Sequence, residues 1–184
     1  METRDLPDDF AVRAVSGAGV SVRPMVAGDL DDVTRAASDP GIWAGHPAQD
    51  RWKPKVFEGY FQFLLTSGGA VVLCDGDGGV IGMSRYYASS DAPEGIGIGF
   101  TFLVRSHWGG ATNLAVKRLM LNEIFHNCPE AWFHIAPSNI RSQKATAKLG
   151  AERMDDRRLD LGTGPADWVR MRLTRALWQA RSAG

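Results

Sequence analysis

Residues 100–113 have the sequence FTFLVRSHWGGATN, in which a short apolar stretch precedes a loop with two adjacent glycines. The apolar residues 100–104 predict a strand, and a helix is expected to begin directly after the glycines. Such a loop presents unpaired backbone N–H groups at the positive end of the helix dipole. Gly109 and Gly110 have no Cβ, so their backbone can lie close to an anion, and Arg105 adds a cation. The stretch therefore predicts a phosphate-binding loop.

The residues after this loop extend the pattern. A long helix is expected over residues 113–127, and the apolar residues 131–135 predict a second strand. Asn139 then opens another helix, which has Ser142 in its first turn and ends at Gly150. Taken in order, this strand, glycine loop, helix, strand and Asn-x-x-Ser helix resemble the GCN5-related N-acetyltransferase (GNAT) superfamily.

The resemblance covers residues 20–178 and is closest to the ribosomal-protein-alanine-acetyltransferase-like (RimJ/RimL-type) branch. Within it, the chain looks like a group whose loop has an aromatic residue before Trp-Gly-Gly and continues to an Asn, here His107 and Asn113. The resemblance implies an α/β (α+β) fold with a mixed, mostly antiparallel, splayed central sheet flanked by helices. It also implies an N-acetyltransferase that uses acetyl-CoA, bound in the splay between the two strands, as its cosubstrate. An amine would attack the thioester directly in a ternary complex, without a metal.

The resemblance also implies which residues bind the coenzyme. Backbone groups of Leu103 and Val104 are expected to hydrogen-bond the pantetheine arm as an added strand would. Asn139 is expected to reach the same arm, and an N-cap role explains an Asn at this position equally well. The full set of cofactor-binding residues is Leu103, Val104, Arg105, His107, Trp108, Gly109, Gly110, Ala111, Thr112, Asn113, Asn139, Arg141, Ser142 and Lys144.

Four cations lie on the helices that follow the loop and could meet the adenosine 3′-phosphate. They are Lys117, Arg118, Arg141 and Lys144. Arg141 and Lys144 are preferred, because the first turn of a helix already favours anions. A solvated helix face carries such charges routinely, which is the alternative explanation.

Acetyl transfer to an amine needs a donor for the leaving thiolate and an acceptor for the amine proton. Similar enzymes have a hydroxyl about three residues after the Asn, and here that residue is Ser142. The related group often has a Glu where this chain has Gly97, so the base assignment is open. Glu94 could act as the base in place of that Glu, although an acidic residue between proline and glycine is often only an exposed loop residue without a catalytic role. His134 could also accept a proton, and a histidine in an apolar strand is often a hydrogen-bonded core residue.

The segment of residues 38–47 resembles the acceptor-side loop of the same group. It contains Trp43 and His46, and Trp52 follows shortly after. Indole rings near the acceptor entrance would attract an ammonium group, or they could simply be packing residues. The acceptor is expected to be a protein N-terminus, an amino acid or another small amine, and the sequence does not choose among them.

Composition excludes several other classes. The chain has 184 residues, 44% of them hydrophobic, with 21 Lys and Arg against 21 Asp and Glu, so no overall field favours nucleic acid or anionic lipid. Apolar runs are too short for a membrane span, and residues 1–9 lack the features of a secretory signal; we therefore expect a cytoplasmic protein. Cys74 and Cys128 have no metal-ligand spacing and are expected to be reduced core residues.

Residues 1–19 are rich in Asp, Pro, Ala and Gly, and predict a flexible lead-in. Residues 20–184 are then expected to form a single acetyltransferase domain. The tail predicts a second hairpin, which carries Trp168 and could form a homodimer edge. The remaining patterns predict strands over residues 21–25, 70–74, 80–87 and 96–104, and helices over residues 28–38, 57–65 and 141–148.

Two other functions remain open from the sequence. The absence of an acidic residue at Gly97 is compatible with a coenzyme-A-binding module that has lost catalysis and acts as a sensor or partner subunit. A phosphate-binding domain for another nucleotide is disfavoured, because Gly110 is followed by Ala111, Thr112 and Asn113 instead of the Gly-Lys-Ser/Thr of a P-loop.

Overall fold

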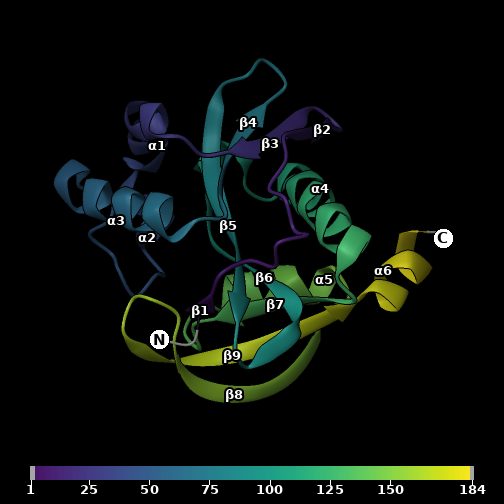
Figure 1. Ribbon diagram of the computed structural model, residues 1–184. Coiled ribbons are helices and arrows are strands. Elements are labelled where there is room, and N and C mark those ends of the chain that lie inside the picture. Colours follow the sequence, from purple (N-terminus) through teal and green to yellow (C-terminus); the bar gives the residue numbers. More distant parts are fainter. Residues whose placement is uncertain (1–2, 183–184) are drawn as a thin grey trace. The chain divides into compact units, whose positions relative to one another are not determined.

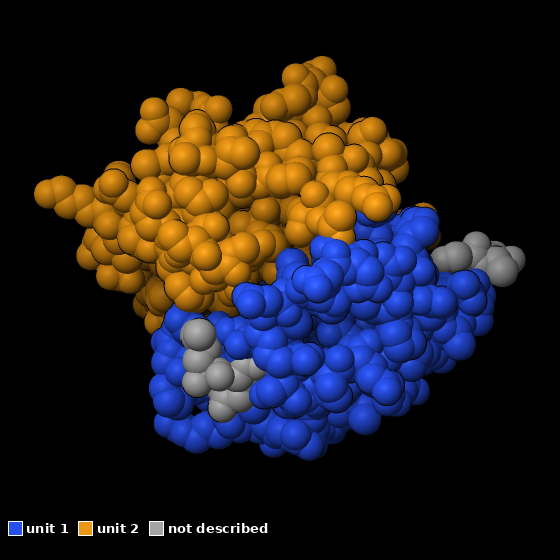
Figure 2. All heavy atoms as spheres, in the orientation of Figure 1, with its two compact units in different colours: residues 1–10, 87–99, 121–184 blue, residues 11–86, 100–120 orange. Residues whose placement is uncertain are grey.

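The computed structural model describes residues 3–182 (Figure 1). They form two compact units, of which unit 1 contains residues 3–10, 87–99 and 121–182 and unit 2 contains residues 11–86 and 100–120 (Figure 2). Predictions for residues 1–2 and 183–184 lie outside the described part. Both units are discontinuous in sequence because three elements run from one into the other, namely β5 (Val80–Ser89), β6 (Ala92–Leu103) and α4 (Thr112–Asn127).

Unit 2 contains an antiparallel series of strands. β2 pairs with β3, β3 with β4, and β4 with the first part of β5. The predicted hairpin between β4 and β5 is confirmed, and Asp75 closes its turn by accepting the backbone N–H groups of Asp77 and Gly79. The bounds of the strands not given above are β2 (Val15–Gly17), β3 (Val20–Pro24) and β4 (Ala70–Asp75).

An apolar core lies between these strands and the helices of unit 2. In α3 (Pro54–Ser67), the side chains of Phe57, Phe61 and Leu64 are fully buried. Their spacing of three and four residues places them on one helix face, and burial stabilises each by roughly 1.5–3 kcal/mol. Figure 1 shows α3 grouped with α1 (Leu30–Ala37) and α2 (Pro40–Trp43). A 3-10 turn, η1 (Ala27–Asp29), directly precedes α1 in the chain.

Unit 1 combines parallel and antiparallel pairing. β6 pairs with β7 (Glu130–Ile135) in parallel, but the register covers only Gly95 to Gly97 on β6. β7 pairs with β9 along its full length, and β9 pairs with β8. The mixed, mostly antiparallel sheet flanked by helices is therefore confirmed. The remaining bounds are β1 (Thr3–Arg4), α5 (Ile140–Lys148), β8 (Glu152–Asp160), β9 (Pro165–Thr174) and α6 (Arg175–Ser182).

The structure differs from the sequence-based expectations at both ends. The segment expected to be a flexible lead-in contains β1, which pairs with the end of β5, and β2, which pairs with β3. Phe10, which lies between β1 and β2 in the sequence, is buried. α6 was not predicted, because the expected pattern ended at Thr174. The single domain of residues 20–184 stays a prediction. Among residues 3–182, no helix is long and apolar enough to cross a membrane.

Candidate coenzyme loop and active site

The predicted phosphate loop lies in unit 2 and is here called the glycine loop, residues 104–113. It begins with a 3-10 turn, η2 (Arg105–His107), which is closed by hydrogen bonds from the N–H of His107 to the carbonyl of Val104 and from the N–H of Trp108 to the carbonyl of Arg105. Gly109 has a φ of +72°, a conformation that glycine adopts without strain. This positive φ lets the chain reverse direction before α4 begins.

The N–H groups that follow the turn are open. Those of residues 109–113 donate to no other residue of the described part of the chain, and residues 109–111 are exposed. The first turn of α4 contains no acidic residue that would repel an anion there. The side chain of His107 is held beside this turn, with its Nδ1 3.1 Å from Oγ1 of Thr112. Because these N–H groups lie at the start of a 16-residue helix, they suit the pyrophosphate of acetyl-CoA.

Arg105, which was predicted to bind the phosphate, forms an ion pair with Asp39 instead. Its Nε lies 2.5 Å from Oδ2 of Asp39, and hydrogen bonds from Arg105 and from the N–H of Gly41 hold the pKa of Asp39 below its usual value. Gly41 leaves room for the guanidinium, since a Cβ there would lie 2.8 Å from Nε. The pair ties the glycine loop to the segment of residues 38–47, which sequence assigned to the acceptor side.

The backbone of Leu103 and Val104 was expected to be free for the pantetheine arm, and in the structure it is engaged. The N–H of Val104 donates to the carbonyl of Ile81 at 2.8 Å, and its carbonyl accepts from His107. The carbonyl of Leu103 accepts the indole N–H of Trp108 at 2.8 Å. A carbonyl keeps a second lone pair, so Leu103 can still accept a bond, whereas the Val104 N–H is already used.

The predicted acceptor-side aromatic residues are mainly packing residues. Trp43 is 3% exposed, donates its indole N–H to the carbonyl of Ala37, and contacts the rings of Phe57 and Phe102. The ring of His46 meets Trp43 edge-on, with its Nδ1 accepting the N–H of Ala48. Trp52 is the exception because it is 36% exposed.

Unit 2 also buries a lysine that was considered only as a phosphate partner. Lys117 is 8% exposed, and its Nζ lies 3.0 Å from Oγ1 of Thr101, which lies 2.7 Å from Oγ of Ser84. Burial lowers the pKa of Lys117 from 10.5 to about 7. Its position therefore does not suit the adenosine 3′-phosphate. The sequence analysis did not predict that this lysine on α4 is buried.

The Asn-x-x-Ser segment lies in unit 1 at the start of α5. Asn139 is the N-cap, and its Oδ1 accepts the N–H of Ser142 at 3.1 Å; the capping role is thus observed, while its amide N–H₂ group and the Ser142 hydroxyl donate to no described residue. Arg141 and Lys144 are exposed, and partial desolvation of the Arg141 guanidinium by nearby protein lowers its pKa. The arrangement can present donors and cations to an anionic ligand.

The proton-transfer candidates of unit 1 differ sharply in exposure. Glu94 is exposed near the start of β6. His134 is buried, with a side-chain exposure of 0%, and both of its ring nitrogens have partners. Nδ1 lies 2.7 Å from the hydroxyl of Tyr87, and Nε2 lies 3.0 Å from Oδ2 of Asp91. We call Tyr87, Asp91, His134 and Arg170 the histidine cluster.

Arg170 completes the histidine cluster from β9, opposite His134 in the register of β7 and β9. Its Nε lies 2.6 Å from Oδ2 of Asp91 as an ion pair, poorly aligned for a hydrogen bond, and its other nitrogens bind Asp155 and the carbonyl of Asp91. Burial alone would raise the pKa of Asp91, but hydrogen bonds from His134 and Ser89 and the charge of Arg170 hold it well below its usual range.

The structure explains why position 97 carries no acidic side chain. A Cβ at Gly97 would clash with the ring of Tyr87, and one at Gly99 would lie 3.0 Å from Cε1 of the same ring. The phenol therefore occupies the space that a side chain on β6 would need. Sequence reasoning missed Tyr87, because it is distant in sequence from the α5 segment where a hydroxyl was sought.

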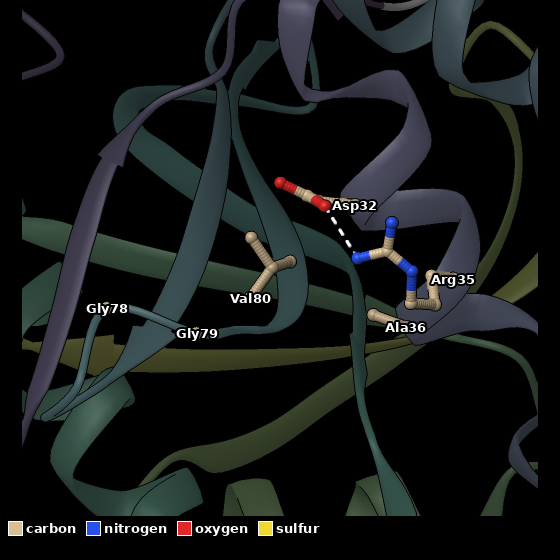
Figure 3. Close-up of a pocket in the computed structure, with 6 residues that line it drawn as sticks. All are labelled: Asp32, Arg35, Ala36, Gly78, Gly79 and Val80. Carbon is tan, nitrogen blue, oxygen red and sulfur yellow. Dashed lines mark hydrogen bonds and ion pairs between the residues drawn. The ribbon is translucent and has the colours of Figure 1, made fainter.

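A separate hollow of about 260 Å³ lies in unit 2, between α1 and the turn of the β4–β5 hairpin (Figure 3). Arg35 and Asp32 form an exposed ion pair at 2.7 Å beside it, and none of the predicted site residues contributes to its walls. Among residues 3–182, no group of three or more His, Cys, Asp or Glu side chains is placed to hold a metal ion. The hollow is lined by Asp32, Arg35, Ala36, Gly78, Gly79 and Val80.

Comparisons with solved structures show the same fold in several acetyltransferases. A GCN5-related N-acetyltransferase from Brucella melitensis is 16% identical with a TM-score of 0.78, covering 100% of this chain and 88% of that one. RimJ from Mycobacterium smegmatis, solved with CoA-disulfide, is 18% identical with a TM-score of 0.64, covering 94% and 92%. The spermidine N-acetyltransferase from Vibrio cholerae, solved with CoA and spermine, is 13% identical with a TM-score of 0.63, covering 89% and 99%.

Comparison of the sequence with curated proteins gave no match. The sequence profile of the acetyltransferase (GNAT) domain, by contrast, matches residues 20–152. This match includes the glycine loop and the start of α5, which carry the open N–H groups and the Asn-x-x-Ser segment described above. The chain therefore belongs to the GNAT acetyltransferase family.

Proposed function

We propose that this chain transfers the acetyl group of acetyl-CoA to a primary amine. The observation that carries the proposal is the row of open N–H groups over residues 109–113, in a chain that belongs to the GNAT family. A pyrophosphate is the group of acetyl-CoA that such a row suits best. The amine attacks the thioester carbonyl directly in a ternary complex, and no covalent enzyme intermediate is required.

The start of α5 supplies the remaining contacts to the coenzyme in this proposal. The amide N–H₂ group of Asn139 donates to the pantetheine arm while its oxygen caps the helix. The hydroxyl of Ser142 donates to the sulfur as the thiolate leaves. Arg141 and Lys144, both exposed, meet the adenosine 3′-phosphate.

The acceptor in this proposal is a protein N-terminus, an amino acid or another small amine. The spermidine N-acetyltransferase neighbour, solved with CoA and spermine, supports an amine acceptor. A RimJ/RimL-like role in the cytoplasm fits the loop sequence. A homodimer through β8 and β9 is the assembly we favour. Trp168 on β9 donates its indole N–H to the carbonyl of Leu159 on β8, which links the two strands of that hairpin.

Thiol release from acetyl-CoA, measured over a panel of amino acids, polyamines, aminoglycosides and short peptides, tests the proposal. Calorimetric titration with acetyl-CoA is run on the same preparations. Asn139→Ala and Ser142→Ala are compared with Ser138→Ala, which removes an exposed hydroxyl one residue before the cap.

We expect turnover with one class of amine, and about a tenfold or larger loss of kcat in Ser142→Ala. Asn139→Ala should weaken coenzyme binding, whereas Ser138→Ala should match the wild type. Tight binding of acetyl-CoA without thiol release on any amine would reject the enzyme and favour a coenzyme-A-binding sensor. Absence of binding would reject both.

A further inference from the structure

Unit 1 contains a buried row of polar side chains that ends at a hydroxyl group. The exposed fraction of the side chain is 0% for His134 and 4% for Asp91, and Tyr87 is 1% exposed as a residue. Removing charged and polar groups from water is costly, and apolar residues of similar volume often stabilise a core equally well. The histidine cluster is therefore poorly explained by stability alone.

The partners of His134 decide which ring nitrogen carries the proton when the imidazole is neutral. An ionised carboxylate only accepts hydrogen bonds, so Asp91, held ionised beside Arg170, requires the proton on Nε2 of the imidazole. Nδ1 of the neutral ring is then an acceptor, and the hydroxyl of Tyr87 donates to it over 2.7 Å. A hydroxyl that donates its proton keeps acceptor lone pairs. Tyr87 is thus set to pass its own proton inward while accepting another.

The phenol lies where two strands stop pairing. The parallel ladder of β6 and β7 ends at Gly97 and Trp132, and the ring of Tyr87 lies against Gly97 and Gly99 of β6. Ligands of α/β proteins commonly bind beyond the carboxyl ends of parallel strands. The hydroxyl is therefore placed at such an end, whereas the carboxylate of Glu94 is exposed near the start of β6.

We propose that Tyr87 accepts the proton of the attacking amine while its own hydroxyl proton moves to Nδ1 of His134. This inference rests on the proposed acetyl transfer. The amine nitrogen bonds to the carbonyl carbon, its proton passes to the Tyr87 oxygen, and the C–S bond breaks with its electron pair leaving on the coenzyme A thiolate. The resulting imidazolium is stabilised by Asp91. Tyr87 is the catalytic residue in this scheme, and His134 and Asp91 are positioning residues.

Steady-state kinetics of Tyr87→Phe, His134→Asn and the double variant test the relay, using the amine that the wild type acetylates. Calorimetric titration with coenzyme A is the parallel measurement. The matched control is Tyr86→Phe, on the neighbouring position of β5. That residue is 2% exposed, and its hydroxyl has a 3.5 Å contact with the carbonyl of Met120. Both single phenylalanine variants remove one buried hydroxyl.

We expect kcat to fall about 100-fold in Tyr87→Phe and in His134→Asn, with the dissociation constant of coenzyme A changed less than about twofold. The double variant should fall no further than the slower single variant, because residues that act as a unit are not additive. Tyr86→Phe should keep the wild-type kcat. If Tyr87→Phe does not fold, His134→Asn carries the same expectation on its own.

Wild-type kcat in Tyr87→Phe would overturn the relay while leaving the acetyltransferase intact. Losses that multiply in the double variant would overturn it as well, because two independent structural effects behave in that way. A wild type that binds coenzyme A and releases no thiol with any amine would instead reject the proposed function, and the relay with it.

Discussion

The glycine loop and the histidine cluster differ in whether their polar groups have hydrogen-bond partners. In the loop, the N–H groups of residues 109–113 have no acceptor in the described part of the chain, and water reaches residues 109–111. In the histidine cluster, both ring nitrogens of His134 are paired and the side chains are removed from water. Exposure decides which arrangement is tolerable, because an unpaired polar group is costly only when it is buried.

This difference in hydrogen-bond pairing matches the two proposed roles, which are anion binding for the loop and proton transfer for the cluster. An anion site must keep its donors unpaired until the ligand arrives, so it belongs on a solvated loop. A proton relay must keep its tautomer and geometry fixed, which dense burial and the pairing of both ring nitrogens of His134 provide. The variants below probe the two arrangements in order of decreasing expected effect.

Lys117 is an intermediate case, since it is buried with one hydroxyl partner. The lowering of its pKa from 10.5 to about 7 corresponds to roughly 5 kcal/mol of lost stability. The folded state releases the proton that the unfolded state keeps, so the penalty is complete below pH 7 and disappears as pH rises to 10.5. Lys117→Met should raise the free energy of unfolding most at pH 6 and not at pH 10.5, measured by urea denaturation. A gain independent of pH would contradict this.

Asp91→Ala breaks the histidine cluster at its charged end. His134 then remains buried without its carboxylate, and buried Arg170 keeps, within residues 3–182, only the ion pair with Asp155, so the free energy of unfolding should fall by about 3–5 kcal/mol, measured by urea denaturation at pH 7. Asp156→Ala is the control, because Asp156 and its partner Arg153 are 54% and 53% exposed and such pairs contribute less than about 1 kcal/mol. Equal losses in the two variants would show that burial of the cluster has no energetic consequence.

Gly110→Pro removes one open donor from the glycine loop. A hydrogen bond to a charged group contributes about 1.5–3 kcal/mol, so the dissociation constant of acetyl-CoA should rise about 10- to 100-fold in calorimetric titration. Gly110→Ala keeps the N–H, and a Cβ there meets nothing within 4 Å, so its affinity should stay near that of the wild type. An equal loss in both variants would point to loop conformation instead of the missing donor.

Arg105 gives the smallest expected effect, since its pair with Asp39 is 57% and 39% exposed. Arg105→Ala and Asp39→Ala should each lower the free energy of unfolding by less than about 1 kcal/mol. The double variant should lose little more than either single one, and 0.5 M NaCl should shrink the differences. A tenfold weaker affinity for acetyl-CoA in Arg105→Ala alone would show that the guanidinium leaves Asp39 for the phosphate.

Local patterns predicted most elements correctly. The apolar spacing of α3 and the glycine content of the β4–β5 turn indicate their structures because helix faces and tight turns depend on neighbours in sequence. The expectation of a flexible lead-in did not foresee β1 and β2, since a strand's pairing partner is not visible in its own composition. The short helix α2 was taken as a loop. Its start is fixed by Asp39, which accepts the N–H of Gly41.

For the candidate site, the sequence indicated which residues to consider and left several of their contacts open. Gly109, Gly110 and the Asn-x-x-Ser segment were found because turns and helix starts need particular residue types. The engagement of the Val104 N–H by Ile81 could not be foreseen, since it depends on strand register. His134 was considered both as a proton acceptor and as a hydrogen-bonded core residue; the structure shows its hydrogen bonds, whose partners lie far from it in sequence.

The sequence by itself determined the order of elements, the position of the glycine loop and the family, because each of these depends on local backbone preferences and residue types. Only the tertiary structure brought Tyr87 and Asp91 to the two nitrogens of His134, buried Lys117 against Thr101, and turned Arg105 toward Asp39. These contacts join residues distant in the chain. They exist because burial and strand pairing remove water, so that each polar group must find its partner inside the protein.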